Sequence, residues 1–146
     1  MDSSPTTLIV ETTANEECPI DFLGDSADIV YFISFAHSER YGADHPLAKA
    51  SSILKRKLGI KLGPLLNYAD ARTENKEEEE HLERMWQDPV ALQDCARAVA
   101  DALETSADIR ELLKAFPELP DRLRELADMA VWATAQGAKM RLTYVI

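Results

Sequence analysis

Three segments in the second half of the chain carry apolar residues at every third or fourth position. This spacing places the apolar side chains on one face of a helix and predicts three amphipathic helices. The first is expected to begin after Asp88, which can cap a helix whose first residue is Pro89. The second is expected to stop before Pro117, and the third to end near Gly137. The predicted buried stripes are Leu92, Cys95 or Ala96, Val99 and Leu103; Ile109, Leu112, Leu113 and Phe116; and Leu119, Leu123, Leu126, Ala130 and Ala133.

Two further helices are predicted between residues 46 and 87. Helical spacing extends over residues 46–58, with proline in the first turn and Gly59 directly after the last apolar position. The connection that follows is expected to pack on the core, because it contains Ile60, Leu62, Leu65 and Leu66. Residues 72–87 predict an exposed, highly charged helix. Its apolar contacts are expected only near its end, at Leu82, Met85 and Trp86.

Both ends of the chain predict β-strands. Leu8, Ile9 and Val10 lie within a threonine-rich stretch, and branched side chains favour an extended conformation. Beyond Gly137, apolar and polar residues alternate, which is the period of two of a half-buried strand. The apolar members of this alternation are Met140, Leu142, Tyr144 and Ile146.

Residues 28–36 are apolar on every side, a pattern shared by buried helices and central strands. Their composition favours a strand, whereas their flanks favour a helix. Asp25 or Ser26 can cap a first helical turn, and Arg40 followed by Gly42 is typical of a last turn. We therefore favour a helix and keep the central strand as the alternative.

These elements predict an α+β fold that is predominantly helical, with five or six helices and a small sheet of two or three strands. Because an isolated pair of strands is marginal in water, three arrangements are open. The N- and C-terminal strands pair against the helices, residues 28–36 supply a third strand, or another copy of the chain completes the sheet. With 146 residues, of which 46% are apolar, we expect a single globular domain over residues 1–146. Residues 1–5 are predicted to be disordered.

The formal net charge is −10, and two segments carry most of it. Residues 1–24 contain five acids and no base, and residues 73–88 contain seven acids against two bases. A pI near 4.7 argues against nucleic acid or an anionic membrane as a partner. No apolar run approaches the roughly 18 residues of a membrane span. The first residues are acidic and polar, unlike a secretory leader, which indicates a cytoplasmic protein.

The acidic part of residues 72–87 is the candidate recognition surface. Complementary charge raises the association rate and the specificity of a complex more than its affinity. We interpret the chain as a non-enzymatic intracellular protein-interaction domain, such as a small acidic inhibitor, antidote or regulator, that binds a basic partner surface. The predicted partner-binding residues are Glu77, Glu78, Glu79, Glu80 and Glu83.

Basic side chains form one cluster, which consists of Lys55, Arg56, Lys57 and Lys61. The cluster could contact an anion, neutralise one of the acidic segments, or form a solvated helix face. Exposed ion pairs contribute only about 0–1 kcal/mol each. Charge alone therefore does not establish an anion site.

Few motifs point to catalysis or metal binding. Glu78 and His81 have E-x-x-H spacing, but carboxylate-bridged metal bundles use this motif twice and the chain contains it once. His37, Ser38 and Glu39 are sequence neighbours whose side chains point in different directions, so they predict no catalytic triad. The chain has no glycine-rich phosphate loop. We predict no metal and no cofactor.

Two alternative functions stay open. A small-ligand binder or enzyme would use a pocket between helices, because such pockets are apolar with a few convergent polar groups. Its candidate polar residues are His37, Glu39, Arg40 and His45. Pairing of terminal strands between copies would instead make the chain a self-assembling homo-oligomer with a structural role.

The cysteines and tryptophans have structural explanations. Cys95, Trp86 and Trp132 lie on or near apolar stripes and are expected to pack in the core. Cys18 is expected in a loop, and the two cysteines do not form a short metal-binding pair.

Overall fold

The structure is a computed structural model that describes residues 6–37 and 44–145. Several predictions fall on other residues: disorder at residues 1–5, the helix end at Arg40 to Gly42, the ligand-binding roles of Glu39 and Arg40, and the strand position of Ile146. These predictions lie outside the described residues.

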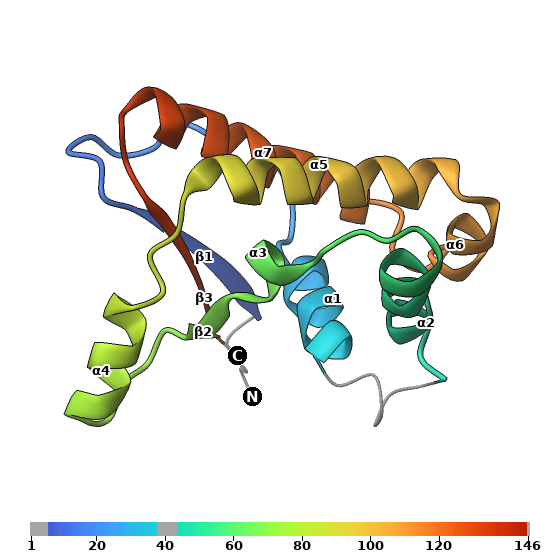
Figure 1. The fold of residues 1–146 in the computed structure, drawn as a ribbon, viewed down its shortest axis with the longest axis horizontal. Coiled ribbons are helices and arrows are strands. Elements are labelled where there is room, and N and C mark those ends of the chain that lie inside the picture. The colour runs from blue at the N-terminus through green and yellow to red at the C-terminus, as the bar shows by residue number, and fades with distance from the viewer. Residues whose placement is uncertain (1–5, 38–43, 146) are drawn as a thin grey trace.

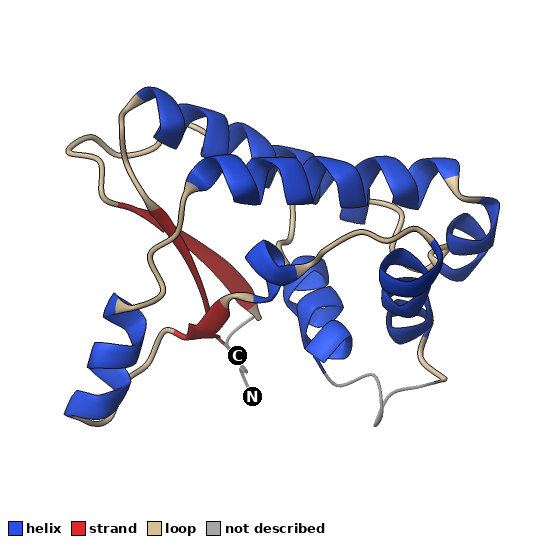
Figure 2. Ribbon diagram, in the orientation of Figure 1, coloured by secondary structure: helices blue, strands red, loops and turns tan. Residues whose placement is uncertain are grey.

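The described residues form seven α-helices, one π-helical turn and three strands (Figures 1 and 2). The strands are β1 (Thr7–Thr12), β2 (Tyr68–Asp70) and β3 (Met140–Val145). The helices are α1 (Ala27–His37), α2 (Pro46–Ser52), the π turn η1 (Ile53–Lys57), α3 (Gly63–Leu66), α4 (Lys76–Glu83), α5 (Pro89–Thr105), α6 (Ala107–Leu112) and α7 (Leu119–Ala135). The predominantly helical α+β fold is confirmed. The helix that the sequence did not predict is α3, a single turn within the expected packed connection.

The two terminal strands pair with each other, as predicted. β1 runs antiparallel to β3, from Thr7 opposite Val145 to Thr12 opposite Met140. β2 pairs in parallel with the other side of β3, so the strand order is β1-β3-β2. The third strand is therefore β2, and residues 28–36 do not enter the sheet.

Residues 28–36 form a helix, α1, as we favoured. Ile29, Phe32 and Ile33 have no exposed surface. The helix contacts β1, α2, α3 and α7, which explains why its sequence is apolar on every side. Asp25 caps its start, since Oδ1 accepts a hydrogen bond from the Ala27 N–H at 2.9 Å.

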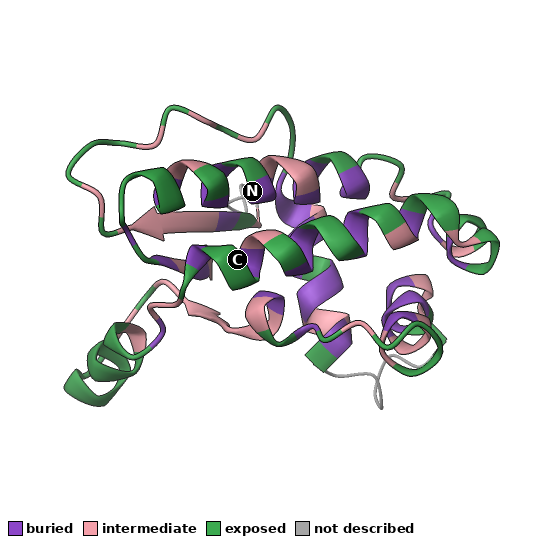
Figure 3. Ribbon diagram, turned by 45° about the horizontal axis from the view of Figure 1, so that its top comes forward, coloured by how far each residue is buried: buried purple, intermediate pink, exposed green. Residues whose placement is uncertain are grey.

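Helices α5 and α7 lie side by side (Figure 1), and each has buried residues along one side and exposed residues along the other (Figure 3). Every residue of the two stripes predicted for them is buried. The predicted start of α5 and the predicted end of α7 are also confirmed. The Asp88 Oδ1 accepts a hydrogen bond from the Val90 N–H at 2.9 Å, and Gly137 follows α7 with a φ of +67°.

Two helices are shorter than predicted. α6 ends at Leu112, and the N–H of Phe116 donates to the Leu113 carbonyl at 2.9 Å in a separate turn. α4 covers Lys76–Glu83 instead of residues 72–87. Its start is fixed by Asn75, whose side chain accepts a hydrogen bond from the Glu78 N–H at 2.9 Å.

The helix predicted over residues 46–58 is divided into α2 and η1. The division occurs because the Leu58 N–H donates to the Ile53 carbonyl, five residues earlier, at 3.1 Å. Most of the predicted apolar face survives the change, since Leu47, Ala50 and Leu54 have no exposed surface. Leu58, predicted as its last member, is 43% exposed.

Candidate functional site

The acidic helix α4 lies at one end of the molecule, away from the paired helices α5 and α7 (Figures 1 and 3). None of its residues is buried. Local interactions replace core contacts. Glu78 makes two of these local interactions at the start of the helix. Its N–H donates to the Asn75 side chain, and its Oε1 accepts from the Glu74 N–H at 2.7 Å. Acidic side chains in the first turn also interact favourably with the helix dipole.

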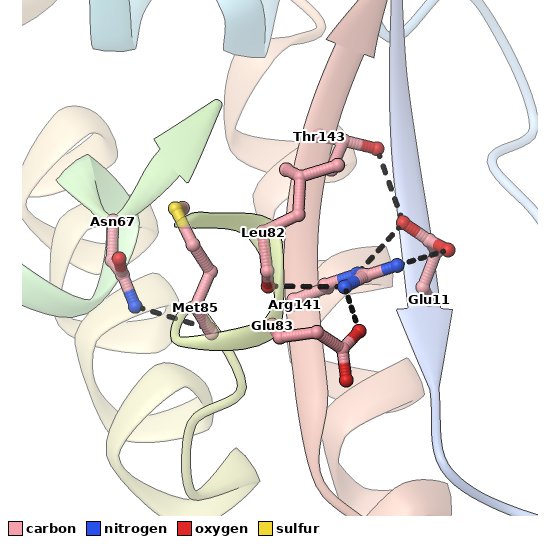
Figure 4. Close-up of polar contacts among 7 residues, drawn as sticks. All are labelled: Glu11, Asn67, Leu82, Glu83, Met85, Arg141 and Thr143. Carbon is pink, nitrogen blue, oxygen red and sulfur yellow. Dashed lines mark hydrogen bonds and ion pairs between the residues drawn. The ribbon is translucent and has the colours of Figure 1, made fainter. Parts of the chain in front are cut away.

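Arg141 on β3 holds the C-terminal end of α4 (Figure 4). Its Nη1 donates to the Leu82 carbonyl at 3.0 Å and lies 3.2 Å from Glu83 Oε2. Its Nε and Nη2 donate to the two carboxylate oxygens of Glu11 at 3.0 and 3.2 Å, and this pairing is the main cause that raises the pKa of Arg141. The guanidinium carbon also lies 4.4 Å from the centroid of the Trp86 ring. One side chain therefore ties α4 to β1 and β3.

Hydrogen bonds also anchor the segment that follows α4. Gln87 and Met140 exchange two backbone hydrogen bonds, at 2.8 and 3.0 Å. The Asn67 amide donates to the Met85 carbonyl at 3.3 Å (Figure 4). α4 is therefore an exposed helix on an anchored base.

The five predicted partner-binding residues differ in their surroundings. Glu83 is paired with Arg141, and Glu78 caps the start of its own helix. Glu77, Glu79 and Glu80 are exposed and form no ion pair within the described part of the chain. Three neighbouring carboxylates thus remain in contact with solvent.

A cavity of about 260 Å³ lies between α4 and β2. Asp70 and Arg72 line it from the strand side, and Glu78 and His81 line it from the helix. Arg72 donates from Nε and Nη2 to Asp70, both at 3.3 Å, which lowers the pKa of the Asp70 carboxyl. The E-x-x-H pair shares this cavity. However, residues 6–37 and 44–145 contain no group of three or more His, Cys, Asp or Glu side chains that could hold a metal ion.

The basic cluster does not meet the acidic helix. α2, which leads directly into η1, and α4 lie at opposite ends of the molecule (Figures 1 and 3). Lys57 pairs with Asp108 of α6 at 2.8 Å, and Lys55 donates to the Ala36 carbonyl at 3.1 Å. Arg56 and Lys61 are exposed. The partner of Lys57 belongs to neither of the two acidic segments, so the ion pair neutralises a different part of the surface.

Both described histidines of the alternative ligand site support the fold. His37 forms a hydrogen bond from Nε2 to the Leu66 carbonyl at 2.8 Å. His45 caps α2, since its Nδ1 accepts from the Leu47 N–H at 3.1 Å, and its ring stacks on Phe35 with 3.8 Å between centroids. These contacts give each ring a structural role.

Comparison with known proteins was made by family, by sequence and by structure. The chain matches no family model, no curated protein and no solved structure. Among the described helices, none has both the length and the apolar character that a membrane crossing requires. The function is therefore inferred from the geometry and charge of the chain itself.

Of the cysteine and the two tryptophans predicted to pack in the core, Cys95 and Trp132 do so, whereas Trp86 is partly buried outside the core cluster. Cys95 is 6% exposed, and burial raises the pKa of its thiol to about 11. Trp132 packs against the core and Trp86 lies under Arg141. Cys18 lies in the loop after β1.

Two arginines with important contacts are not marked by the sequence patterns. Arg122 is only 5% exposed, with Nη2 donating to Glu125 Oε2 at 3.0 Å and Nε 2.9 Å from Oε1 without the alignment of a hydrogen bond. Its position three residues after Leu119, at the border of the apolar stripe, is a signal that could have revealed it. Arg141 has no such signal, because its partner Glu11 lies 130 residues away.

Proposed function

We propose that this chain is an intracellular protein-interaction domain and that α4 binds a basic surface of a partner protein. One observation supports this proposal above all. Glu77, Glu79 and Glu80 are exposed side chains on a short helix that has no buried residue, and they form no ion pair among the described residues.

The charge density of α4 is unfavourable for the isolated chain. Like charges three or four residues apart, such as Glu79 and Glu83, repel by a few tenths of a kcal/mol. The helix is nevertheless held by its N-cap and by Arg141 instead of by a buried face. A basic partner would relieve the repulsion.

The anchored base of α4 also favours binding. Association costs free energy when the binding element must become ordered. Here the helix is already formed, and its C-terminal end is tied to β1 and β3 through Arg141. The acidic surface is therefore presented in a fixed orientation.

The experiment captures partner proteins on the immobilised full chain and then measures the affinity of each purified partner at low and at high salt. In the α4 variant, E77Q/E79Q/E80Q, we expect the affinity at low salt to fall about tenfold. Three exposed ion pairs worth about 0.5 kcal/mol each give this change. High salt should weaken binding of the parent chain and should affect the α4 variant less.

The matched control is the variant E111Q/E118Q/D121N, which removes the same number of charges from exposed positions on α6 and around the start of α7, away from α4 (Figure 1). It should leave the affinity within about twofold, because screened charges act over roughly 10 Å. Two results would exclude α4 as the recognition surface: equal affinity of the partner for the α4 variant and the parent chain, or equal affinity for the parent chain at low and at high salt.

A further inference from the structure

β1 forms an edge of the sheet, because within residues 6–37 and 44–145 it pairs only with β3. Successive residues of an antiparallel strand direct their backbone N–H and C=O groups to opposite sides. The N–H of Thr13, directly after β1, donates to the Lys139 carbonyl at 3.0 Å on the β3 side. Odd-numbered residues of β1 therefore face β3, and the even-numbered Leu8, Val10 and Thr12 face away from it.

The hydrogen bond of Leu8 agrees with this direction. Its N–H donates to Ser26 Oγ at 3.0 Å, on the open side of the strand. Further along, the backbone groups of Val10 and the N–H of Thr12 make no hydrogen bond within the described residues. An edge with unpaired donors and acceptors can accept another strand.

A groove of about 470 Å³ lies along this open edge. One wall is β1, and the other is the loop of residues 13–25, which returns from the end of β1 to the start of α1 (Figure 1). Ile20, Phe22 and Met129 contribute apolar surface. The volume is within the range of about 300–1,000 Å³ that ligand pockets occupy.

The charged residues along the groove are acidic. Glu16, Glu17 and Asp21 line it from the loop and are exposed. Glu11 lines it from β1, but this carboxylate is already paired with Arg141. Among the described residues, no lysine, arginine or histidine lines the groove.

We propose that this groove binds an extended basic segment of a partner protein, which adds to the open edge of β1 as a fourth strand. The backbone of the segment pairs with Val10 and Thr12. Its lysine or arginine side chains pair with Glu16, Glu17 and Asp21. Alternate side chains of a strand point to opposite faces, so apolar residues of the segment can contact the apolar wall. The groove is separate from α4, and this proposal does not depend on the function of that helix.

Other occupants satisfy only part of this arrangement. A second copy of the chain would bring its own β1 and the same carboxylates into the groove, and like charges oppose such pairing. A free polyamine would match the charge but would offer no backbone to Val10 and Thr12. An extended basic peptide matches both the charge and the open edge.

The test titrates the full chain with a capped peptide of alternating lysine and valine, as long as the six residues of β1. We expect binding by calorimetry, with shifted NMR signals and slower exchange of the Val10 and Thr12 amide protons. A second peptide carries N-methyl groups on the backbone of both its valines and its lysines. It keeps the charge, cannot donate backbone hydrogen bonds from either edge, and should bind about tenfold more weakly because two such bonds are lost.

Two protein variants with equal change in charge separate the groove from α4. The groove variant, E16Q/E17Q/D21N, should bind the lysine–valine peptide about tenfold more weakly. The α4 variant, E77Q/E79Q/E80Q, should bind it within about twofold of the parent. Val10→Pro removes the outward N–H at an edge strand, where proline is tolerated, and should also weaken binding. If this variant does not fold, the N-methylated peptide tests the same hydrogen bonds on the parent chain.

Three results would overturn the proposal. Equal weakening by the two triple variants would mean attraction by overall charge. Equal affinity for the N-methylated peptide would mean that the edge of β1 is not used. A dimer in sedimentation that the peptide does not dissociate would mean that a second copy occupies the edge. None of these results bears on whether α4 binds a partner, so the two proposals fail separately.

Discussion

Arg141 and Glu83 form an ion pair with unequally buried members: the side chain of Arg141 is 13% exposed and that of Glu83 is 73% exposed. Water can solvate Glu83 when the pair is broken. The guanidinium depends on protein acceptors, because a buried charge without partners is costly. The attachment of α4 therefore rests on Arg141, with Glu83 as one of several acceptors.

Arg141→Ala should lower the free energy of unfolding by about 2–4 kcal/mol, because it removes hydrogen bonds to Glu11 and Leu82 and the contact with Trp86. Glu83→Gln should lower it by less than about 1 kcal/mol. Denaturant unfolding of both variants measures the difference. Equal losses would mean that Arg141 is not the centre of this attachment.

Gly24→Ala should destabilise the fold by about 1–3 kcal/mol through overpacking. An added Cβ would overlap Nη1 of Arg122, which cannot move away easily because it is paired with the largely buried Glu125. Gly63→Ala is the matched control, since no atom lies within 4 Å of the added Cβ. Thermal unfolding should separate the two, and similar melting temperatures would show that Arg122 can adjust.

The two cysteines should react at very different rates with a thiol reagent. Burial holds the pKa of Cys95 at about 11, so its thiol stays protonated and enclosed at neutral pH. Cys18 is partly exposed in the loop after β1. We expect one fast thiol in the folded chain, none in Cys18→Ser, and two after denaturation. A fast thiol that persists in Cys18→Ser would contradict the burial of Cys95.

Asp28 should make stability depend on pH in the acidic range. Burial raises the pKa of its carboxyl above the ordinary value of 3.8, with smaller contributions from Asp25 and Glu118. A raised pKa means that the folded state binds the proton more tightly than the unfolded state. This group therefore weakens the folded state at neutral pH, and the penalty is lost as pH falls through its folded and then its unfolded pKa.

The test of this linkage compares Asp28→Asn with the parent chain. The stability of Asp28→Asn relative to the parent should be greater at pH 7 than near pH 3, where the carboxyl is largely protonated in both states. Denaturant unfolding at the two pH values measures it. The same relative stability at both values would mean that the pKa of Asp28 is not raised.

The parts of the fold that local patterns describe were predictable. Leu92 and Val99 mark the buried face of α5, and Asp88 caps it, all within three turns of one helix. The alternation predicted for β3 holds only in part: Met140 and Leu142 are buried, but so is Thr143, which the pattern places on the opposite face. The short strand β2 could not be predicted, because the three residues Tyr68–Asp70 are too few for a period of two to appear. Its place in the sheet depends on a strand far along the chain.

The acidic residues of the candidate site were visible in the sequence, but their surroundings were not. Glu80 and Glu83 are equivalent in the sequence pattern, yet of the two only Glu83 forms an ion pair with Arg141 of β3. The groove beside β1 is harder still to predict, since it is defined partly by backbone groups of Val10 and Thr12. Every residue has such groups, and only the sheet pairing determines which of them remain open.

The central position of β3 has a consequence for biosynthesis. This strand follows every other described element along the chain, and β1 and β2 have no other partner among the described strands. Until β3 has emerged from the ribosome, β1 and β2 have no strand to pair with, although each exposes an edge. A partly synthesised chain that lacks β3 is therefore more prone to aggregate than the folded chain.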